Sequence, residues 1–178
     1  MKMPDEIAAK AKDAIVALKA AGLTIATAES CTGGLIGGAL TSVSGSSEVV
    51  YGGFITYDNA AKIAMIGVPP RVIEDFGAVS PQVARAMADG ARNTARVGIA
   101  LSVTGIAGPN GGSPQKPVGL VYFACATAEG TRVVEKRFGN LGRDGVREAS
   151  VLTALELVVD VVSNGVGTPL PEPSVPRT

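Results

Sequence analysis

Three apolar segments, each followed by a polar and glycine-rich stretch, constrain the fold of this chain more than any other feature. They cover residues 23–29, 49–57 and 97–105. The first and third are nearly continuous aliphatic runs, as expected for strands buried on both faces of a sheet. Segments with apolar residues at helical spacing lie between them. This alternation of strands and helices predicts a three-layer α/β/α domain with a mostly parallel sheet.

The rest of the chain contributes a hairpin and the remaining helices. Residues 117–138 predict two strands joined around Glu129 and Gly130, so one strand of the sheet is expected to be antiparallel. Ser80 is the expected N-cap of one helix, because its hydroxyl can accept a hydrogen bond from a free N–H group of the first turn. The expected helices cover residues 5–21, 33–43, 59–67, 69–77, 80–96 and 143–162.

Composition indicates a core of small side chains. Hydrophobic residues make up 46% of the chain and aromatic residues only 4%, so Ala, Val, Ile and Leu must fill the interior. Gly52 and Gly53 in the second apolar segment indicate a bulge, a close backbone approach or a weakened strand. We expect a single domain over residues 1–165, followed by a proline-rich mobile tail over residues 166–178.

The absence of histidine excludes whole classes of site. Without an imidazole there is no Ser-His-Asp triad, no Cys-His pair and no histidine metal ligand. The two cysteines, Cys31 and Cys125, are too few and too far apart in sequence for a disulfide framework or a structural zinc site. These observations argue against a structural zinc site, and we expect no cofactor. Acid–base chemistry has to come from a carboxylate, an amine, a phenol, a thiol or water.

The charge pattern argues against nucleic-acid and membrane partners. The 16 basic and 16 acidic residues balance, so no net field gathers nucleic acid or attracts a membrane surface. No uncharged run reaches the roughly 18 residues of a membrane span, and residues 1–22 carry charges unlike a signal peptide. We expect a cytoplasmic protein. A charged fraction of 18%, below the roughly 25% usual for soluble domains, favours a homo-oligomer.

Polar and glycine-rich residues gather directly after each of the three predicted parallel strands. These segments cover residues 29–34, 56–62 and 104–117. Ligands of open α/β sheets bind beyond the carboxyl ends of the strands, so three such loops favour one shared site. The alternative is that the glycines only allow tight turns.

The first loop holds three adjacent candidate nucleophiles, Ser30, Cys31 and Thr32. Ser30 stands at the start of a predicted helix, where it is either a simple N-cap or a nucleophile whose oxyanion is held by backbone N–H groups. The same N–H groups suit a phosphate, and one helix end is not expected to serve both. Cys31 is the rival nucleophile because a thiol has a lower pKa than a hydroxyl. Cys125 lies within a predicted strand and is expected in the core.

A serine nucleophile needs a base, and Lys62 is the candidate in this chain. A lysine in a dry pocket loses its charge more readily and can accept the serine proton as a neutral amine. Tyr57 and Asn59 belong to the same predicted strand–helix junction, and the Tyr57 hydroxyl suits the relay or donation of a proton. The alternatives are an ordinary solvated lysine and a tyrosine that packs at the strand end.

The third loop and the last helix offer groups that suit an anion. Thr104 and Gly105 open a loop whose backbone amides can point at an anionic or carbonyl oxygen, although its spacing matches neither a Walker A motif nor a dinucleotide fingerprint. Arg143 and Arg147, one helical turn apart, suit a phosphate clamp. The alternative is that they pair with neighbouring carboxylates, Asp144 or Glu148.

Four motifs carry a resemblance to a known family. In this order and spacing, "AESCTGG", "GFITYDNAAK", "GAVS" and "SVTGIAGPNGGSPQKPVGLVY" closely resemble the stand-alone form of the CinA C-terminal domain family of nicotinamide mononucleotide deamidases. The likeness runs from about Thr24 to Leu157. It implies hydrolysis of the carboxamide of nicotinamide mononucleotide, giving nicotinate mononucleotide and ammonia. It also implies an α/β/α fold with a mixed five-stranded sheet, no metal and oligomeric assembly.

The resemblance also implies roles for single residues. Ser30 matches the family's nucleophile and Lys62 its general base, with Tyr57 as a third catalytic residue. The substrate-binding residues that it implies are Cys31, Thr32, Gly33, Gly34, Asn59, Thr104, Gly105, Gly111, Gly112 and Arg143.

Two other classes of function use the same residues differently. A non-catalytic nucleotide-binding module would need the loops but no reactive serine, and a structural or interaction domain would need neither. The enzyme interpretation is favoured because a hydroxyl, an amine and glycine-rich loops coincide at strand ends. We therefore predict an amidohydrolase whose substrate is a small-molecule nucleotide.

Overall fold

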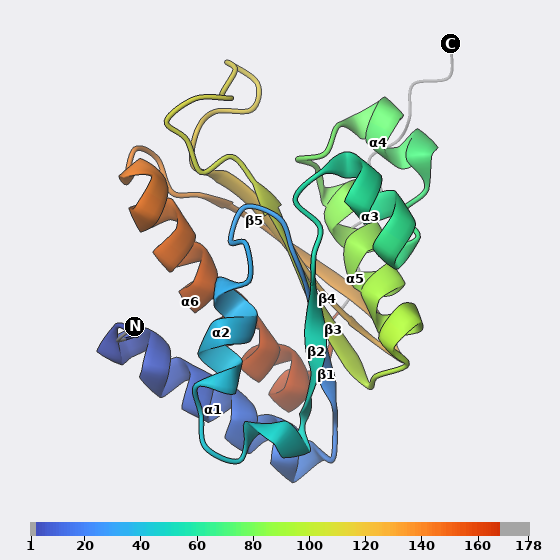
Figure 1. The fold of residues 1–178 in the computed structure, drawn as a ribbon, viewed down its shortest axis with the longest axis vertical. Helices are drawn as coiled ribbons and strands as arrows, with labels where there is room; N and C mark the ends of the chain where they lie inside the picture. The colour runs from blue at the N-terminus through green and yellow to red at the C-terminus, as the bar shows by residue number, and fades with distance from the viewer. Residues whose placement is uncertain (1–2, 168–178) are drawn as a thin grey trace.

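The computed structural model describes residues 3–167, in which five strands form one sheet with helices on both faces (Figure 1). The strand order is β2-β1-β3-β4-β5. The first three strands in the chain are parallel, and β4 is antiparallel to both of its neighbours. The predicted mixed, mostly parallel sheet is therefore confirmed. The strands are β1 (Ile25–Glu29), β2 (Val50–Ile55), β3 (Ile99–Gly105), β4 (Leu120–Thr127) and β5 (Gly130–Arg137).

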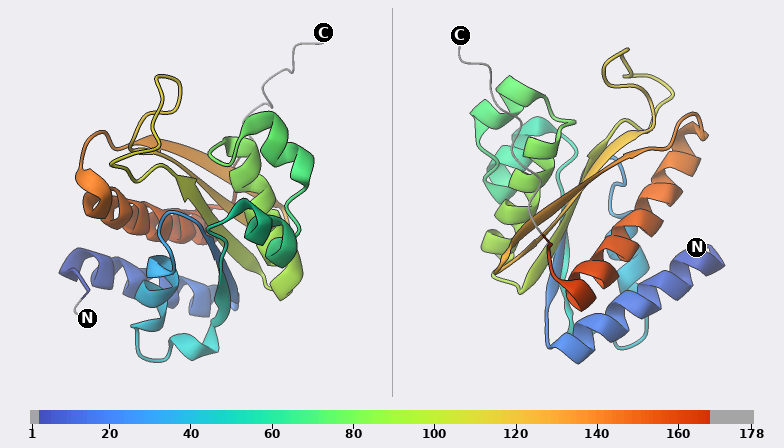
Figure 2. Two further views of the ribbon diagram at one scale, coloured as in Figure 1. Left: turned by 45° about the horizontal axis from the view of Figure 1, so that its top comes forward. Right: turned by 180° about the vertical axis from the view of Figure 1, so that it is seen from behind.

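The helices form two layers, one on each face of the sheet (Figure 2). α1, α2 and α6 cover one face, and α3, α4 and α5 cover the other. The three-layer architecture predicted from the alternation of elements is confirmed. The helices are α1 (Asp5–Ala21), α2 (Leu35–Thr41), α3 (Asn59–Ile66), α4 (Pro70–Phe76), α5 (Pro81–Ala95) and α6 (Gly142–Asn164), with a short 3-10 turn, η1 (Ser46–Glu48).

Small side chains fill the core, as the composition indicates. Where α5 crosses β4, Ala84 and Ala88 pack directly on Ala124 and Ala126, so this helix lies close to the sheet. The other face is filled mostly by Ile, Leu and Val side chains from α1, α6 and the strands. Cys125 is fully buried among them, which confirms its predicted place in the core.

Of the features proposed for the glycines of the second strand, the bulge is present. The pairing of β1 with β2 shifts by one residue between Val50 and Gly52, which leaves Tyr51 as a bulge. A Cβ at Gly53 would collide with the Thr27 side chain. Glycine at position 53 therefore leaves space for the Thr27 hydroxyl on the neighbouring strand.

Two boundaries differ from the sequence-based expectation. The hairpin turn consists of Ala128 and Glu129, because Thr127 pairs with Gly130, one residue earlier than predicted. The proposed tail over 166–178 lies outside the described residues except for its first two positions. Of these, Val166 is partly buried against the core.

Among residues 3–167, no helix is both long and apolar enough to cross a bilayer.

Two helical glycines provide a matched test of this packing. A Cβ at Gly90 of α5 would collide with the carbonyl oxygen of Ile66, whereas a Cβ at Gly38 of α2 would meet no other atom within 4 Å. We expect Gly90→Ala to lower the free energy of unfolding by about 1–3 kcal/mol through overpacking. Gly38→Ala should raise it by about 0.5–1 kcal/mol through helix propensity. Urea unfolding of both variants measures this, and equal shifts would contradict the packing of α5 on α3.

Candidate active site

The carboxyl end of β1 is the topological switch point of the sheet. β2 lies on one side of β1 and β3 on the other, and the chain reaches them over opposite faces (Figure 1). Backbone pairing continues past the strand ends: the Ser30 N–H donates to the Val103 carbonyl (3.1 Å), and the Thr56 N–H donates to the Glu29 carbonyl (2.8 Å). The loops after β1 and β2 thus begin side by side, where open α/β sheets bind ligands.

A buried carboxylate, Glu29, organises the loop after β1. Only 1% of this residue is exposed. Its carboxylate accepts hydrogen bonds from the Thr32 hydroxyl (2.7 Å) and from the N–H groups of Gly34, Ile36 and Gly37 (3.0, 3.1 and 2.8 Å). The start of a helix presents unpaired N–H groups and partial positive charge, both of which suit a carboxylate. Glu29 is therefore the capping group of α2.

Ser30 does not cap α2, so that alternative for its role was wrong. α2 begins at Leu35 because Gly33 and Gly34 adopt left-handed backbone conformations, with φ of 59° and 98°. The Gly33 N–H turns back to the Ser30 carbonyl (3.1 Å), which closes a tight turn directly after Ser30. The Ser30 hydroxyl is consequently available to a different partner.

That partner is Lys62, in the first turns of α3. Lys62 is 1% exposed, and its Nζ lies 3.3 Å from Ser30 Oγ, 2.9 Å from the Thr56 carbonyl oxygen and 3.3 Å from the Tyr57 carbonyl oxygen. Carbonyl oxygens only accept hydrogen bonds, so they orient two N–H bonds of the amine. The remaining position on nitrogen faces Ser30, where a neutral amine carries its lone pair. The predicted Ser30–Lys62 proximity is therefore present in the structure.

Burial shifts the pKa of Lys62 and the pKa of the Cys31 thiol in opposite directions. Loss of water around the ammonium group lowers the pKa of Lys62 from its ordinary 10.5, and the charge of Asp58 only partly opposes this shift. Burial raises the pKa of the Cys31 thiol to about 12, and the Glu29 charge adds to that rise. A thiol that stays protonated is a poor nucleophile. The site thus favours Ser30 over Cys31.

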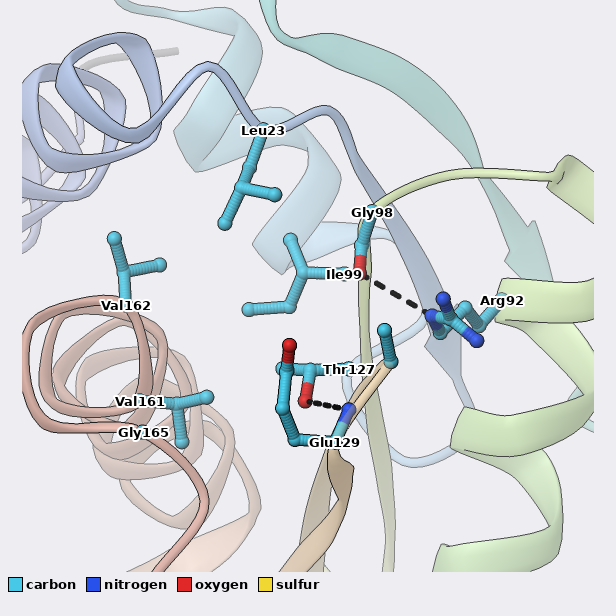
Figure 3. Close-up of a pocket in the computed structure, with 10 residues that line it drawn as sticks. Leu23, Arg92, Gly98, Ile99, Thr127, Glu129, Val161, Val162 and Gly165 are labelled. Atoms are coloured by element: carbon cyan, nitrogen blue, oxygen red, sulfur yellow. Dashed lines mark hydrogen bonds between the residues drawn. The ribbon is translucent and has the colours of Figure 1, made fainter.

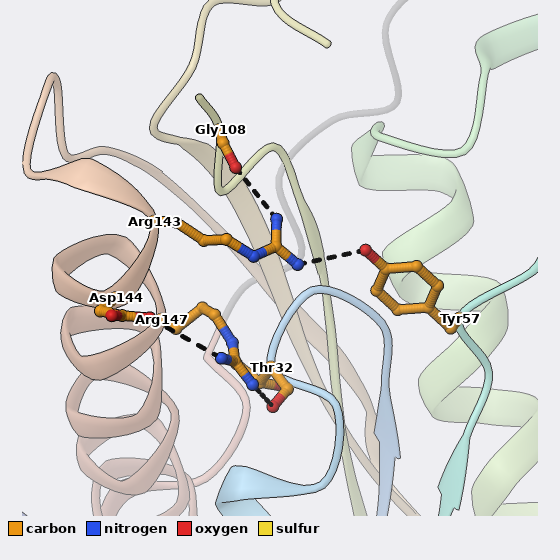
Figure 4. Close-up of polar contacts among 6 residues, drawn as sticks. All are labelled: Thr32, Tyr57, Gly108, Arg143, Asp144 and Arg147. Carbon is orange, nitrogen blue, oxygen red and sulfur yellow. Dashed lines mark hydrogen bonds and ion pairs between the residues drawn. The ribbon is translucent and has the colours of Figure 1, made fainter. Parts of the chain in front are cut away.

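Two arginines of α6 reach across to the loops (Figure 4). Arg143 donates to the Gly108 carbonyl (3.0 Å) and to the Tyr57 hydroxyl (3.2 Å). Arg147 donates to the Thr32 carbonyl (3.3 Å). Each of the three strand-end loops is therefore bonded to α6. The Tyr57 ring is 61% exposed and points toward Arg143 (Figure 4), whereas only its backbone carbonyl contacts Lys62. A catalytic role for its hydroxyl stays a prediction.

Other residues expected at the site have structural contacts or lie in exposed loops. The Thr104 hydroxyl, which is buried, donates to the Ala78 carbonyl (2.8 Å). A Cβ at Gly105 would lie 2.7 Å from Val121 Cγ2, so this glycine is needed for packing on β4. Their proposed substrate contacts stay predictions. The same holds for three exposed residues that no described contact joins to Ser30, namely Asn59, Gly111 and Gly112.

A separate cavity of about 270 Å³ lies near the amino ends of β1 and β3, away from the strand ends that carry the three loops (Figure 3). It is lined mostly by apolar groups, including Leu23, Ile99 and Val161, together with Arg92 and the hairpin turn. The Arg92 Nε–H already donates to the Gly98 carbonyl (3.2 Å). No residue proposed for the site lines this cavity.

Among residues 3–167, no three Cys, Asp or Glu side chains gather as a metal site would require.

Comparison with known proteins agrees with the motifs. Residues 7–162 match the model of the CinA C-terminal domain. The chain belongs to this family. A CinA-like protein of Geobacter sulfurreducens is 53% identical over 135 residues, which are 76% of this chain and 32% of that protein. A CinA-like protein of a Synechococcus species is 50% identical over 142 residues, or 79% of this chain and 34% of that protein. The chain thus spans about a third of the length of these relatives.

Solved structures of the family share the fold. The competence/damage inducible protein CihA from Agrobacterium tumefaciens is 48% identical, with a TM-score of 0.88 over 92% of this chain and 100% of that one. A CinA superfamily protein from Escherichia coli is 29% identical, with a TM-score of 0.84 over 90% of this chain and 94% of that one. Both matched chains are covered almost completely, so their fold corresponds to the described domain.

Sequence reasoning missed the role of Glu29 in this CinA-family site and the role of the Thr56 carbonyl. Glu29 matches no capping box, because it precedes a glycine turn rather than the first helical residue. The available signal was its position: a glutamate at the end of an otherwise apolar strand has to be paired if it is buried. No side-chain pattern identifies a backbone carbonyl such as that of Thr56.

Removal of the Glu29 charge tests the capping role. We expect Glu29→Gln to lower the free energy of unfolding by about 1–3 kcal/mol, because an amide nitrogen faces donors and leaves buried N–H groups unsatisfied. Glu48→Gln is the control, since Glu48 forms an exposed ion pair with Lys19 and its loss should matter by less than about 1 kcal/mol. Urea unfolding compares the two, and similar small shifts would show that Glu29 is not needed.

The lowered pKa of Lys62 predicts a pH dependence of stability. At pH values between the folded-state pKa and 10.5, the unfolded chain binds a proton that the folded chain does not. Wild-type stability relative to Lys62→Met should therefore rise with pH in this window, by at most about 1.4 kcal/mol per pH unit. Urea unfolding of both proteins from pH 7 to pH 10 measures the difference. A constant difference would indicate that Lys62 keeps its ordinary pKa.

Proposed function

We propose that this chain is an amidohydrolase that removes ammonia from the carboxamide of nicotinamide mononucleotide and produces nicotinate mononucleotide. Ser30 is the nucleophile and Lys62 the general base. The observation that carries the proposal is the buried amine of Lys62, which lies 3.3 Å from Ser30 Oγ with a lowered pKa. The substrate is the one that the motif resemblance implies, and family membership supports it.

The first half of the reaction forms an acyl-enzyme. Neutral Lys62 takes the proton of Ser30, and Ser30 Oγ bonds to the carboxamide carbon. The resulting ammonium of Lys62 donates to the Thr56 and Tyr57 carbonyls, which stabilises the charge that it gains. Lys62 then returns the proton to the amide nitrogen as the carbon–nitrogen bond breaks, so ammonia leaves.

The second half releases the product. Lys62, neutral again, takes a proton from a water molecule, whose oxygen attacks the acyl carbon. The carbon–oxygen bond to Ser30 breaks, and Ser30 regains a proton from Lys62. Atoms balance over the cycle: one amide and one water give one carboxylic acid and one ammonia. Ser30 and Lys62 end as they began.

The oxyanion of each tetrahedral intermediate needs donors other than the start of α2. The N–H groups of Gly34, Ile36 and Gly37 are bound by Glu29. Cys31 and Thr32 follow Ser30 directly, and their N–H groups donate to no backbone carbonyl within the described residues. We assign the oxyanion to these two N–H groups. Removal of one oxyanion donor typically lowers the rate by about 10²–10³.

Three variants and one substrate test the proposal. Ammonia release from nicotinamide mononucleotide should be lost in Ser30→Ala and fall by about 10²–10⁴ in Lys62→Met, as expected for loss of a general base. Cys31→Ala is the matched control at the adjacent position and should retain most of the activity. Activity should also rise with pH as Lys62 deprotonates.

Three results would contradict the proposal in different ways. Near wild-type turnover in Ser30→Ala or Lys62→Met would remove the role assigned to that residue. Loss of activity only in Cys31→Ala would transfer the nucleophile to the thiol. Wild-type protein that is stabilised by the mononucleotide in a thermal-shift measurement, with no ammonia formed, would indicate a non-catalytic nucleotide-binding module.

A further inference from the structure

The hydroxyl of Thr56 is buried and has no hydrogen-bond partner within residues 3–167. An unpaired buried hydroxyl destabilises a folded chain, whereas a valine of nearly the same shape would not. Other buried hydroxyls of the domain are paired: those of Ser102, Thr104 and Ser150 donate to backbone carbonyls. The Thr56 hydroxyl therefore suits a partner from outside the polypeptide, such as a substrate or a water molecule.

The backbone of Thr56 is fixed on both sides. Its N–H donates to the Glu29 carbonyl (2.8 Å), and its carbonyl accepts from Lys62 Nζ (2.9 Å). The side chain itself is β-branched and has few rotamers. The unpaired hydroxyl is consequently held with little freedom, on the same residue that orients the amine of Lys62.

The register of the sheet places this hydroxyl on the same face as Ser30. Phe54 and Ala28 pair across β2 and β1, and both pack in one apolar cluster with residues of α3 and α5. Ser30 and Thr56 each come two residues later, so the alternation of side chains directs both to that face. Neighbouring strands lie about 4.8 Å apart. The two hydroxyls are thus neighbours at the strand ends, on the face that carries Lys62.

The second half of the proposed reaction requires a bound water molecule at this place. Once Ser30 Oγ is esterified, Lys62 keeps its two carbonyl partners, and its lone pair can accept a hydrogen bond from water. A buried water needs at least two polar partners, and Lys62 supplies one of them. The Thr56 hydroxyl can supply the other, because a hydroxyl oxygen accepts hydrogen bonds.

We propose that Thr56 is the water-positioning residue of the hydrolytic step, and that its Oγ1 accepts a hydrogen bond from the water that attacks the acyl-enzyme. This inference rests on the proposed function. The water donates its other hydrogen to neutral Lys62, so a lone pair of its oxygen remains to bond to the acyl carbon. That proton passes to Lys62, the carbon–oxygen bond to Ser30 breaks, and Lys62 returns the proton to Ser30 Oγ. Thr56 neither gains nor loses a proton, and the ammonia-forming step does not use it.

Two variants of Thr56 separate its hydroxyl from its shape. Thr56→Val should lower steady-state turnover of nicotinamide mononucleotide by about 10–100-fold, the range of a lost hydrogen bond in a buried site. Thr56→Ser keeps the hydroxyl and should retain most of the turnover. Because only hydrolysis of the acyl-enzyme slows, a rapid-quench measurement of Thr56→Val should show a burst of about one ammonia per enzyme before the slow phase. Nicotinate mononucleotide should appear without a burst.

Mass spectrometry of the intact protein provides a second measurement. Thr56→Val mixed with the mononucleotide should accumulate an acyl group on Ser30. Thr56→Ser should not accumulate it, and neither should the double variant Ser30→Ala, Thr56→Val.

Ser102→Ala is the matched control for a purely structural hydroxyl. The Ser102 hydroxyl is also buried and donates to the Ala84 carbonyl of α5 (2.6 Å), so its removal should lower the urea midpoint of unfolding without accumulation of acyl-enzyme. Thr56→Val should leave the midpoint unchanged or raise it. A midpoint lowered as far as in Ser102→Ala would show that the Thr56 hydroxyl has a partner in the protein, and would overturn the inference.

The kinetic outcomes distinguish this inference from the proposed function. Wild-type turnover in Thr56→Val, or slow turnover with neither an ammonia burst nor an acyl-enzyme, would overturn the role of Thr56 and leave the roles of Ser30 and Lys62 intact. If the wild type forms no ammonia from the mononucleotide, the proposed function fails and the role of Thr56 fails with it.

Discussion

The chemistry proposed for this chain depends on one physical constraint, the burial of a primary amine that forms no ion pair with any carboxylate among residues 3–167. Lys62 is almost entirely removed from water, and its hydrogen-bond partners are two backbone carbonyls and the Ser30 hydroxyl. An ammonium ion in such a place loses its hydration, and the charge of Asp58 compensates for this loss only in part, so the pKa of Lys62 falls. In the proposed reaction, a chain without histidine obtains in this way a base that accepts a proton nearer neutral pH. The Thr56 and Tyr57 carbonyls also orient the amine of Lys62, because they accept two of its hydrogen bonds.

A buried carboxylate, Glu29, keeps the loop of the proposed nucleophile in place. Glu29 satisfies the start of α2 from within the strand that precedes it, and the glycine turn at positions 33 and 34 lets the chain pass around its carboxylate. The two buried groups therefore have separate tasks on neighbouring loops. Glu29 shapes the loop that presents Ser30, and Lys62 is the group that we propose to activate the Ser30 hydroxyl. Because Glu29 uses the helix N-terminal donors, both the oxyanion and any phosphate depend on other groups.

The third element is α6, which joins loops that are distant in the sequence. Through Arg143 and Arg147 it contacts the loops after β1, β2 and β3. Lys116 adds a further link, because its Nζ donates to the Phe76 carbonyl at the end of α4 (2.7 Å). The glycine-rich loop is thus held between both helical layers of the domain. A site assembled from three loops requires such cross-links, since no single loop is rigid enough to position two reacting groups.

Much of this protein follows from sequence patterns that act locally. The order of strands and helices and the mostly parallel sheet follow from periodicity and glycine placement. The absence of histidine made Lys62 a candidate base, and the motif resemblance selected Ser30 over Cys31. These features are local because helix and strand periods and strand-end loops depend on neighbouring residues. Only the tertiary structure decided that Glu29 rather than Ser30 caps α2, that burial raises the pKa of the Cys31 thiol, and that Tyr57 faces Arg143. Those outcomes depend on contacts between residues far apart in the chain, such as Arg143 with Tyr57. They also depend on which groups are buried, and the sequence alone does not reveal which side chains lose their contact with water.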